Sequence, residues 1–77
     1  MLLGPGMNIA RVPTAGRNYE YSAGEDPYLG ALMVPAIVRG IQAQGVIATA
    51  KHFINNNQET DRYGVNAVVS ERAMMEL

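Results

Sequence analysis

Residues 46–53 read Val-Ile-Ala-Thr-Ala-Lys-His-Phe, an apolar run that ends in a lysine and the only histidine of the chain. The apolar part is short and partly β-branched, with a glycine before it and the amide-rich loop 55–59 after it. We therefore predict a buried strand over 46–50. Strand ends in α/β folds are where polar groups meet ligands. Lys51 and His52 in this place indicate a site for a ligand rich in hydroxyl groups.

A helix is predicted before this strand. Asp26-Pro27 is an N-cap followed by proline at the first helical position, and Gly45 is a typical stop. The apolar residues at helical spacing are Leu29, Leu32, Met33, Ala36, Ile37 and Ile41. Pro35 inside the helix removes a hydrogen bond and clashes one turn back, at about 3 kcal/mol. We therefore predict a break or a kink, with the main helix beginning near residues 30–31.

The remaining segments complete a simple order of elements. Residues 1–3 resemble the tail of a strand that Gly-Pro-Gly ends, and 4–26 form a long structured loop. After the strand come a polar loop, the short apolar segment 65–69 and a helix that begins after Ser70 as its N-cap. The order strand, loop, helix, strand predicts a βαβ unit with parallel strands and a right-handed crossover.

Composition excludes several classes of protein. The chain has 77 residues and no cysteine, so it is at most one small domain without disulfides. One histidine and no cysteine argue against a transition-metal site, and we expect no cofactor. A net charge of −1 gives no argument for nucleic acid or an anionic membrane, and the apolar runs are too short to span a membrane. No secretory signal is seen, and the compartment and oligomeric state stay open.

The βαβ geometry brings separated polar residues to one edge. The loop after the first strand and the end of the second strand share the carboxyl edge of the sheet. Arg11, Arg17 and the tyrosines of the loop then face the same space as Lys51 and His52. Neighbouring residues of a regular strand point to opposite faces, so a shared site requires a bulge, a sharp bend or another irregularity there.

Each candidate also has a purely structural interpretation. Lys51 could be a surface lysine, although its place after a buried strand argues against this. His52 could be a core histidine with its hydrogen bonds satisfied. Pattern alone favours Arg17 as a brace that pairs with Glu20 or Glu25, and it favours a structural role for the other arginine of the loop too. No carboxylate is singled out by spacing as an acid or a base.

Eight motifs follow one another in the chain. They are Leu3-Gly4-Pro5-Gly6, Asn8-Ile9 with Arg11 and Pro13, Gly16 to Tyr21, Gly24 to Leu29, Gly40 to Val46, Lys51-His52-Phe53, Asn56 to Thr60, and Val69 to Ala73. In this order and spacing the chain resembles the catalytic barrel domain of glycoside hydrolase family 3, of the β-glucosidase type. The resemblance implies an α/β fold, as an incomplete β-α-β segment of a (β/α)8 TIM-like barrel. Residues 1–77 would be part of the family's N-terminal barrel domain.

The resemblance also implies site residues. In the family, the arginine of the Gly-Arg-Asn-aromatic-Glu motif and the lysine and histidine of the Lys-His-Phe motif bind sugar hydroxyls at the −1 subsite. This implies Arg17, Lys51 and His52 as substrate-binding residues. Family members are retaining glycosidases with an Asp nucleophile and a Glu acid/base. The nucleophile lies in a Ser-Asp-Trp-like motif and this chain has no Trp, so we expect no catalytic carboxylate in it.

The resulting expectation is part of a retaining β-glucosidase that releases terminal non-reducing β-D-glucosyl residues. The partner is a β-glucoside or an oligosaccharide, with no metal, nucleic acid or membrane. Residues 54–59 lack the Gly-His-containing loop of the family's N-acetylglucosaminidases, which favours the glucosidase or xylosidase branch. Two alternatives stay open: a β-xylosidase or another exo-glycosidase of the family, and a non-catalytic fragment that is inactive on its own.

Overall fold

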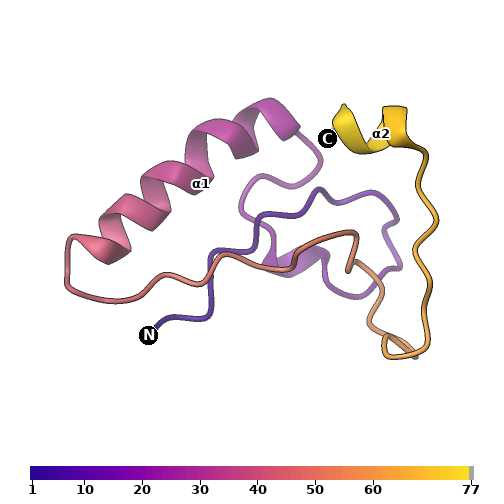
Figure 1. Ribbon diagram of the computed structural model, residues 1–77, viewed down its shortest axis with the longest axis horizontal. Helices are drawn as coiled ribbons and strands as arrows, with labels where there is room; N and C mark the ends of the chain where they lie inside the picture. Colours follow the sequence, from indigo (N-terminus) through magenta and orange to yellow (C-terminus); the bar gives the residue numbers. More distant parts are fainter. Residues whose placement is uncertain (77) are drawn as a thin grey trace.

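The computed structural model of the chain describes residues 1–76. It contains a short 3-10 helix, η1 (Asn18–Glu20), and two α-helices, α1 (Pro27–Gln42) and α2 (Glu71–Met75). Figure 1 shows both α-helices on one side of irregular segments that run back and forth beneath them. Within the described residues no segment forms a regular strand. The predicted β-α-β unit is therefore not confirmed.

Two isolated parallel bridges stand where the strand pair was predicted. Leu2 pairs with Ala48 and Gly6 pairs with Lys51, so the first segment and the segment after α1 run side by side (Figure 1). From one bridge to the next, the first segment advances by four residues, from 2 to 6, and the second by three, from 48 to 51. The first segment therefore has one extra residue between the bridges. An extra residue interrupts a ladder and bends the chain. The parallel direction is as predicted, but the pairing is not continuous.

Local signals at both ends of α1 act as predicted. The Asp26 carboxylate accepts a hydrogen bond from the Leu29 backbone N–H at 3.1 Å, and the chain turns away at Gly45 with φ of 70°. The predicted break and the start near residues 30–31 are wrong, because α1 is one helix from Pro27 that includes Pro35. The alternative, a kink at Pro35, stays a prediction. Pro35 has no N–H to donate to the Ala31 carbonyl one turn earlier. Both residues are exposed, and water is a usual partner for such a backbone group.

The inward face of α1 is rotated by about one residue from the prediction. Its inward residues are the buried Gly30 and the half-buried Met33, Val34, Ile37, Val38 and Ile41. Leu29 and Leu32, predicted to face inward, are 42% and 57% exposed. Gly30 lies at the start of this inward face, where an added Cβ would make ordinary contact with Ala23 Cβ at 3.6 Å. Both sides of α1 are thus apolar, as in helices that are covered all round.

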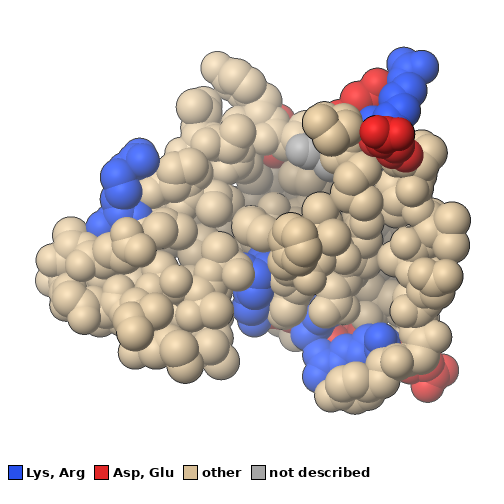
Figure 2. Space-filling view, in the orientation of Figure 1, with Lys and Arg blue, Asp and Glu red and all other residues tan. Residues whose placement is uncertain are grey.

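The chain has little core of its own. Among residues 1–76, the buried side chains include the apolar Tyr21 and the charged Arg17, at 8% and 6% exposure, and Pro5. Among residues 1–76 no large side chain is fully buried, and Ile47, in the predicted buried strand, is 67% exposed. Figure 2 shows a face made mostly of uncharged residues, with charged side chains mainly toward its margins. Large apolar side chains such as Leu3 and Val68 are exposed, and contiguous apolar surface is typical of a face that packs against something else.

The C-terminal part follows its local signals. The segment 65–70 has no regular structure, and α2 begins after Ser70, whose hydroxyl accepts a hydrogen bond from Ala73 N–H at 3.3 Å. The predicted N-cap is confirmed. Neither helix in the described part of the chain combines the length and the apolar character needed to cross a membrane.

Candidate functional site

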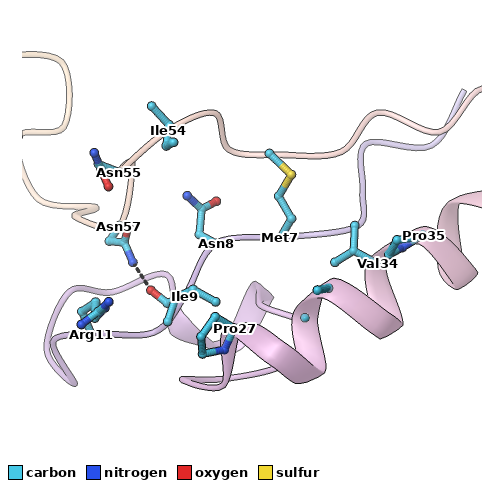
Figure 3. A pocket seen from close by; sticks show the side chains of 12 residues that line it. Met7, Asn8, Ile9, Arg11, Pro27, Val34, Pro35, Ile54, Asn55 and Asn57 are labelled. Carbon is cyan, nitrogen blue, oxygen red and sulfur yellow. Dashed lines mark hydrogen bonds between the residues drawn. The ribbon is translucent and has the colours of Figure 1, made fainter. Parts of the chain in front are cut away.

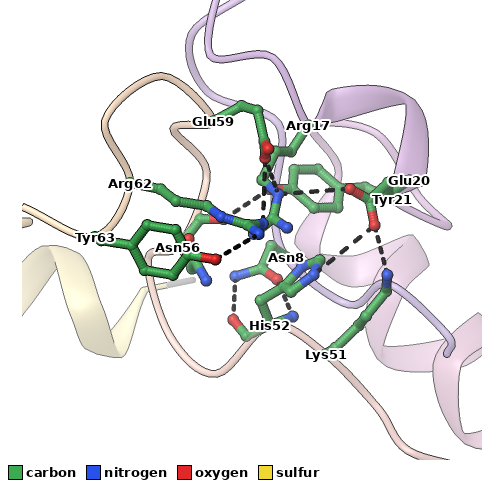
Figure 4. Close-up of polar contacts among 10 residues, drawn as sticks. All are labelled: Asn8, Arg17, Glu20, Tyr21, Lys51, His52, Asn56, Glu59, Arg62 and Tyr63. Carbon is green, nitrogen blue, oxygen red and sulfur yellow. Dashed lines mark hydrogen bonds and ion pairs between the residues drawn. The ribbon is translucent and has the colours of Figure 1, made fainter. Parts of the chain in front are cut away.

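One carboxylate, that of Glu20, is the centre of a polar cluster (Figure 4). Lys51 Nζ donates a hydrogen bond to Glu20 Oε2 at 2.6 Å. His52 Nε2 lies 3.8 Å from the same oxygen, and Arg17 Nε lies 3.5 Å from Oε1. The three residues predicted from the sequence to share a site therefore converge on one side chain.

A glycine explains how separated segments reach this carboxylate. Gly6 makes parallel bridges both to Lys51 and to Tyr21, so it lies between the two segments that carry the cluster. The short helix η1 ends at Glu20, one turn after Arg17. A Cβ on Gly6 would collide with the Glu20 carbonyl oxygen. Close approach of the three backbones therefore requires glycine at this position.

Asn8 anchors the backbone of His52. The His52 N–H donates to Asn8 Oδ1 at 2.5 Å, and Asn8 Nδ2 donates to the His52 carbonyl at 2.8 Å. The peptide bond between Lys51 and His52 is cis, and both side chains turn to the same carboxylate. Residues 51–53 form no regular strand, and Lys51 makes only an isolated bridge, so the irregular backbone that a shared site requires is present.

A second carboxylate, that of Glu59, lies on the other side of Arg17. Its Oε2 is 2.8 Å from Arg17 Nε and 3.5 Å from Arg62 Nη1. Gly16, at φ of 97°, lets the backbones meet, since a Cβ there would lie 2.8 Å from Glu59 Cβ. The predicted contact of Arg17 with Glu20 is confirmed, and Arg17 is held between two acids.

The cluster shifts the protonation equilibria of its members. The hydrogen bond from Lys51 holds the pKa of Glu20 below its ordinary value. Burial lowers the pKa of His52, and the positive charges of Arg17 and Lys51 act in the same direction. Burial also raises the pKa of Tyr21. At neutral pH the site therefore contains two cations, an ionised Glu20 and a neutral imidazole.

Some polar atoms of the cluster remain available. Arg17 Nη1 and His52 Nδ1 are buried without a hydrogen-bond partner among residues 1–76. Buried polar atoms nearly always have partners, so these atoms suit a ligand with hydroxyl groups. In the same part of the chain no three His, Asp or Glu side chains group in a way that could hold a metal ion.

The other residues predicted at this edge divide into two groups. Tyr21 joins the cluster, and its hydroxyl donates to the Asn56 carbonyl at 3.5 Å. Tyr19 is 87% exposed. Arg11 instead lines an apolar groove of about 370 Å³ between α1 and the segments around Ile9 and Ile54 (Figure 3). The prediction that Arg11 faces the space of Lys51 and His52 is therefore wrong.

Sequence reasoning named Glu20 only as a partner of Arg17, three residues before it, and not as the centre of the site. It missed Asn8 and Glu59, because their contacts join residues more than 40 positions apart in the chain. Local spacing carries no information about such contacts.

The whole chain, residues 1–77, matches the sequence profile of the Glycosyl hydrolase family 3 N terminal domain. The chain belongs to glycoside hydrolase family 3. This confirms the predicted resemblance, and it gives the domain a TIM-barrel type of fold. No solved structure gives a significant match.

Several curated relatives are similar over the full chain. A beta-glucosidase of Ruminococcus albus is 53% identical over 76 residues, which is 99% of this chain and 8% of that protein. The thermostable beta-glucosidase B of Acetivibrio thermocellus is 49% identical, over 100% of this chain and 10% of that protein. An exo-alpha-(1->6)-L-arabinopyranosidase of Bifidobacterium longum is 51% identical, with the same coverage. The chain thus spans about a tenth of the length of these family 3 relatives.

Proposed function

We propose that the chain is part of the N-terminal barrel domain of a retaining β-glucosidase, and that it binds the terminal sugar at the −1 subsite. Arg17, Lys51 and His52 are the sugar-binding residues. The observation that carries this proposal is their convergence on Glu20, in a chain about half identical to β-glucosidases.

The donors fit a sugar. The Lys51 ammonium has three N–H groups, and one of them is directed to Glu20. The guanidinium of Arg17 has five N–H groups in a fixed fork, and Nη1 has no partner within the described residues. A hydrogen bond from an ionised donor contributes roughly 1.5–3 kcal/mol. Neutral His52 can both donate and accept, as a hydroxyl requires.

Binding of this kind also assists the reaction. Hydrogen bonds that strengthen as the sugar ring approaches an oxocarbenium ion lower the barrier, because they stabilise the transition state more than the ground state. In our proposal the Asp nucleophile and the Glu acid/base lie outside residues 1–77. Glu20 and Asp26 already have other tasks, as the partner of Lys51 and the cap of α1.

A chimaera tests the proposal. The chain replaces the 76 aligned residues of the Ruminococcus albus beta-glucosidase, and the product is assayed on an aryl β-glucoside. We expect turnover, and we expect Lys51→Ala to reduce kcat/KM by at least about tenfold, the loss of one such hydrogen bond. Glu76→Gln is the control, because Glu76 pairs with Arg72 on the exposed surface of α2. A folded chimaera without turnover, or Lys51→Ala with unchanged kinetics, would contradict the proposal.

The isolated chain tests whether the catalytic carboxylates lie outside residues 1–77, as we propose. We expect no hydrolysis of the aryl β-glucoside by the 77 residues alone, at concentrations where the chimaera is active. Turnover by the isolated chain would show that it holds its own catalytic carboxylates.

A second candidate is an exo-glycosidase for a pentopyranose, since one relative is an arabinopyranosidase at 51% identity. The donors of Arg17 and Lys51 bind ring hydroxyls that glucose and pentopyranoses both have. The chimaera is therefore also assayed on an aryl β-xyloside and an aryl α-L-arabinopyranoside. The largest kcat/KM decides between the candidates, and we expect it for the glucoside.

A further inference from the structure

Glu20 contacts all three proposed sugar-binding residues, and its carboxylate has no other task in the described cluster. Oε2 accepts from Lys51 at 2.6 Å and lies near His52, while Oε1 lies near Arg17. Its side chain is only 17% exposed. A brace of the loop needs one cation partner, whereas this carboxylate has Arg17 three residues before it and Lys51 31 residues after it.

The positive charges of Arg17 and Lys51 repel each other, and an anion between them offsets this repulsion. Lys51 and Arg17 both lower the pKa of His52 through their positive charge, which shows that their fields overlap at the site. Glu20 offsets this repulsion, and it takes one N–H of the Lys51 ammonium. A long, flexible lysine side chain held at one N–H is preorganised for a ligand at the other two.

We propose that Glu20 is a positioning residue of the sugar site, which acts through Lys51 and does not itself touch the sugar. The inference rests on the proposed function, because it requires that Lys51 binds the sugar. Without the Glu20 carboxylate the Lys51 ammonium loses its fixed direction. The lysine side chain must then be ordered when the sugar binds, and this entropic cost reduces the net free energy of binding.

Glu59 provides the matched comparison. It is also a glutamate paired with Arg17, at 2.8 Å, but its side chain is 51% exposed. The contacts of its carboxylate within residues 1–76 are with Arg17 and Arg62, not with Lys51. A substitution at Glu59 thus removes a similar charge nearby and leaves the Lys51 contact intact.

The test is a double-mutant cycle in the chimaera, with kcat/KM on the aryl β-glucoside as the readout. We expect Glu20→Gln, which keeps the shape and removes the charge, to reduce kcat/KM by about tenfold or more. In the Lys51→Ala background the same change should reduce it by less than about twofold, because the residue through which it acts is already gone. Glu59→Gln should give the same factor with Lys51 as without it.

The outcomes separate two failures. A Glu20→Gln effect that is equally large in the Lys51→Ala background would mean that Glu20 only braces the fold, and it would overturn the inference alone. Unchanged kinetics in Lys51→Ala would remove the proposed function, and the inference with it. If Glu20→Gln does not give folded protein, Glu20→Asp replaces it, since it keeps the charge and moves it back by one methylene. Coupling to Lys51 below about twofold in that cycle would also overturn the inference.

Discussion

The cluster around Glu20 and the outer face of α1 are opposite in character. The cluster joins residues far apart in the chain, as in the pair of Lys51 with Glu20, and its acids and bases find partners within it. The outer face, with Leu29 and Leu32, is apolar and exposed. The difference shows that the polar site is assembled by this chain itself, whereas the apolar surface around it is not covered by it.

This difference has an energetic consequence. A typical hydrogen bond contributes only about 0.5–1.5 kcal/mol net, and burial of apolar surface supplies most of the stability of a domain. We therefore expect apolar packing against the outer face of α1 to add to the stability of the arrangement that holds the cluster. In a TIM-type barrel the helices form a ring around the sheet and lie beside one another, and we expect the side of α1 with Leu29 and Leu32 to pack against a neighbouring element there.

The largest expected effect comes from a charge on that outer face. In the chimaera, Leu32→Glu should abolish folded protein or lower stability by about 3–5 kcal/mol, because it buries an unpaired carboxylate. In the isolated chain the same change should be harmless and should reduce binding of a hydrophobic dye. Thermal melts and soluble yield measure the first, and dye fluorescence the second. Arg39→Gln, at an exposed position of α1, is the control. An equally stable Leu32→Glu chimaera would mean that this face stays in solvent.

The next effect concerns the junction at Gly6. Gly6→Ala in the chimaera should lower stability by about 1–3 kcal/mol, the usual cost of overpacking, since the new Cβ meets the Glu20 carbonyl oxygen. It should also reduce kcat/KM, because Lys51 and Glu20 would move apart. Gly40→Ala in α1 is the matched control. No atom lies within 4 Å of its added Cβ, and helix propensity predicts a gain of up to about 1 kcal/mol. Equal melting temperatures for the two variants would refute the close approach.

The smallest effect is a shift in titration. His52 is the only histidine, so one imidazole signal in the NMR spectrum of the isolated chain reports its pKa. We expect a pKa below the ordinary value of 6.5. The unfolded state then binds more protons than the folded one, so the free energy of unfolding decreases as the pH falls below 6.5. Glu20→Gln should lower the pKa further, because the carboxylate raises it, and Glu76→Gln should not. A pKa of 6.5 or above would show that the cluster does not form in the isolated chain.

The features that sequence predicts well here are local or carried by motifs. The caps of Asp26 and Ser70 need only three neighbouring residues, and both are confirmed. The three predicted site residues converge on Glu20, and two short motifs identified them in the sequence. The strand over 46–50 was not predictable in the same way, because a ladder needs neighbours on both sides and the described residues give it one irregular partner.

The wrong helix face has a related cause. With apolar residues on both sides of α1, periodicity alone does not say which side meets this chain and which side stays exposed. The contact of Lys51 with Glu20 was missed for a different reason. It joins residues 31 positions apart, and neither residue alone predicts the other.

The double pairing of Gly6 has a practical consequence for engineering. Because one backbone position joins the segment of Tyr21 to that of Lys51, we expect the proposed sugar-binding groups to behave as one structural unit. Residues 4–8, 16–21 and 51–59 should be transplanted together when the specificity of one family member is moved into another. A graft of the Lys-His-Phe motif alone would place these side chains beside the carboxylate and the backbone junction of the recipient, not beside Glu20 and Gly6.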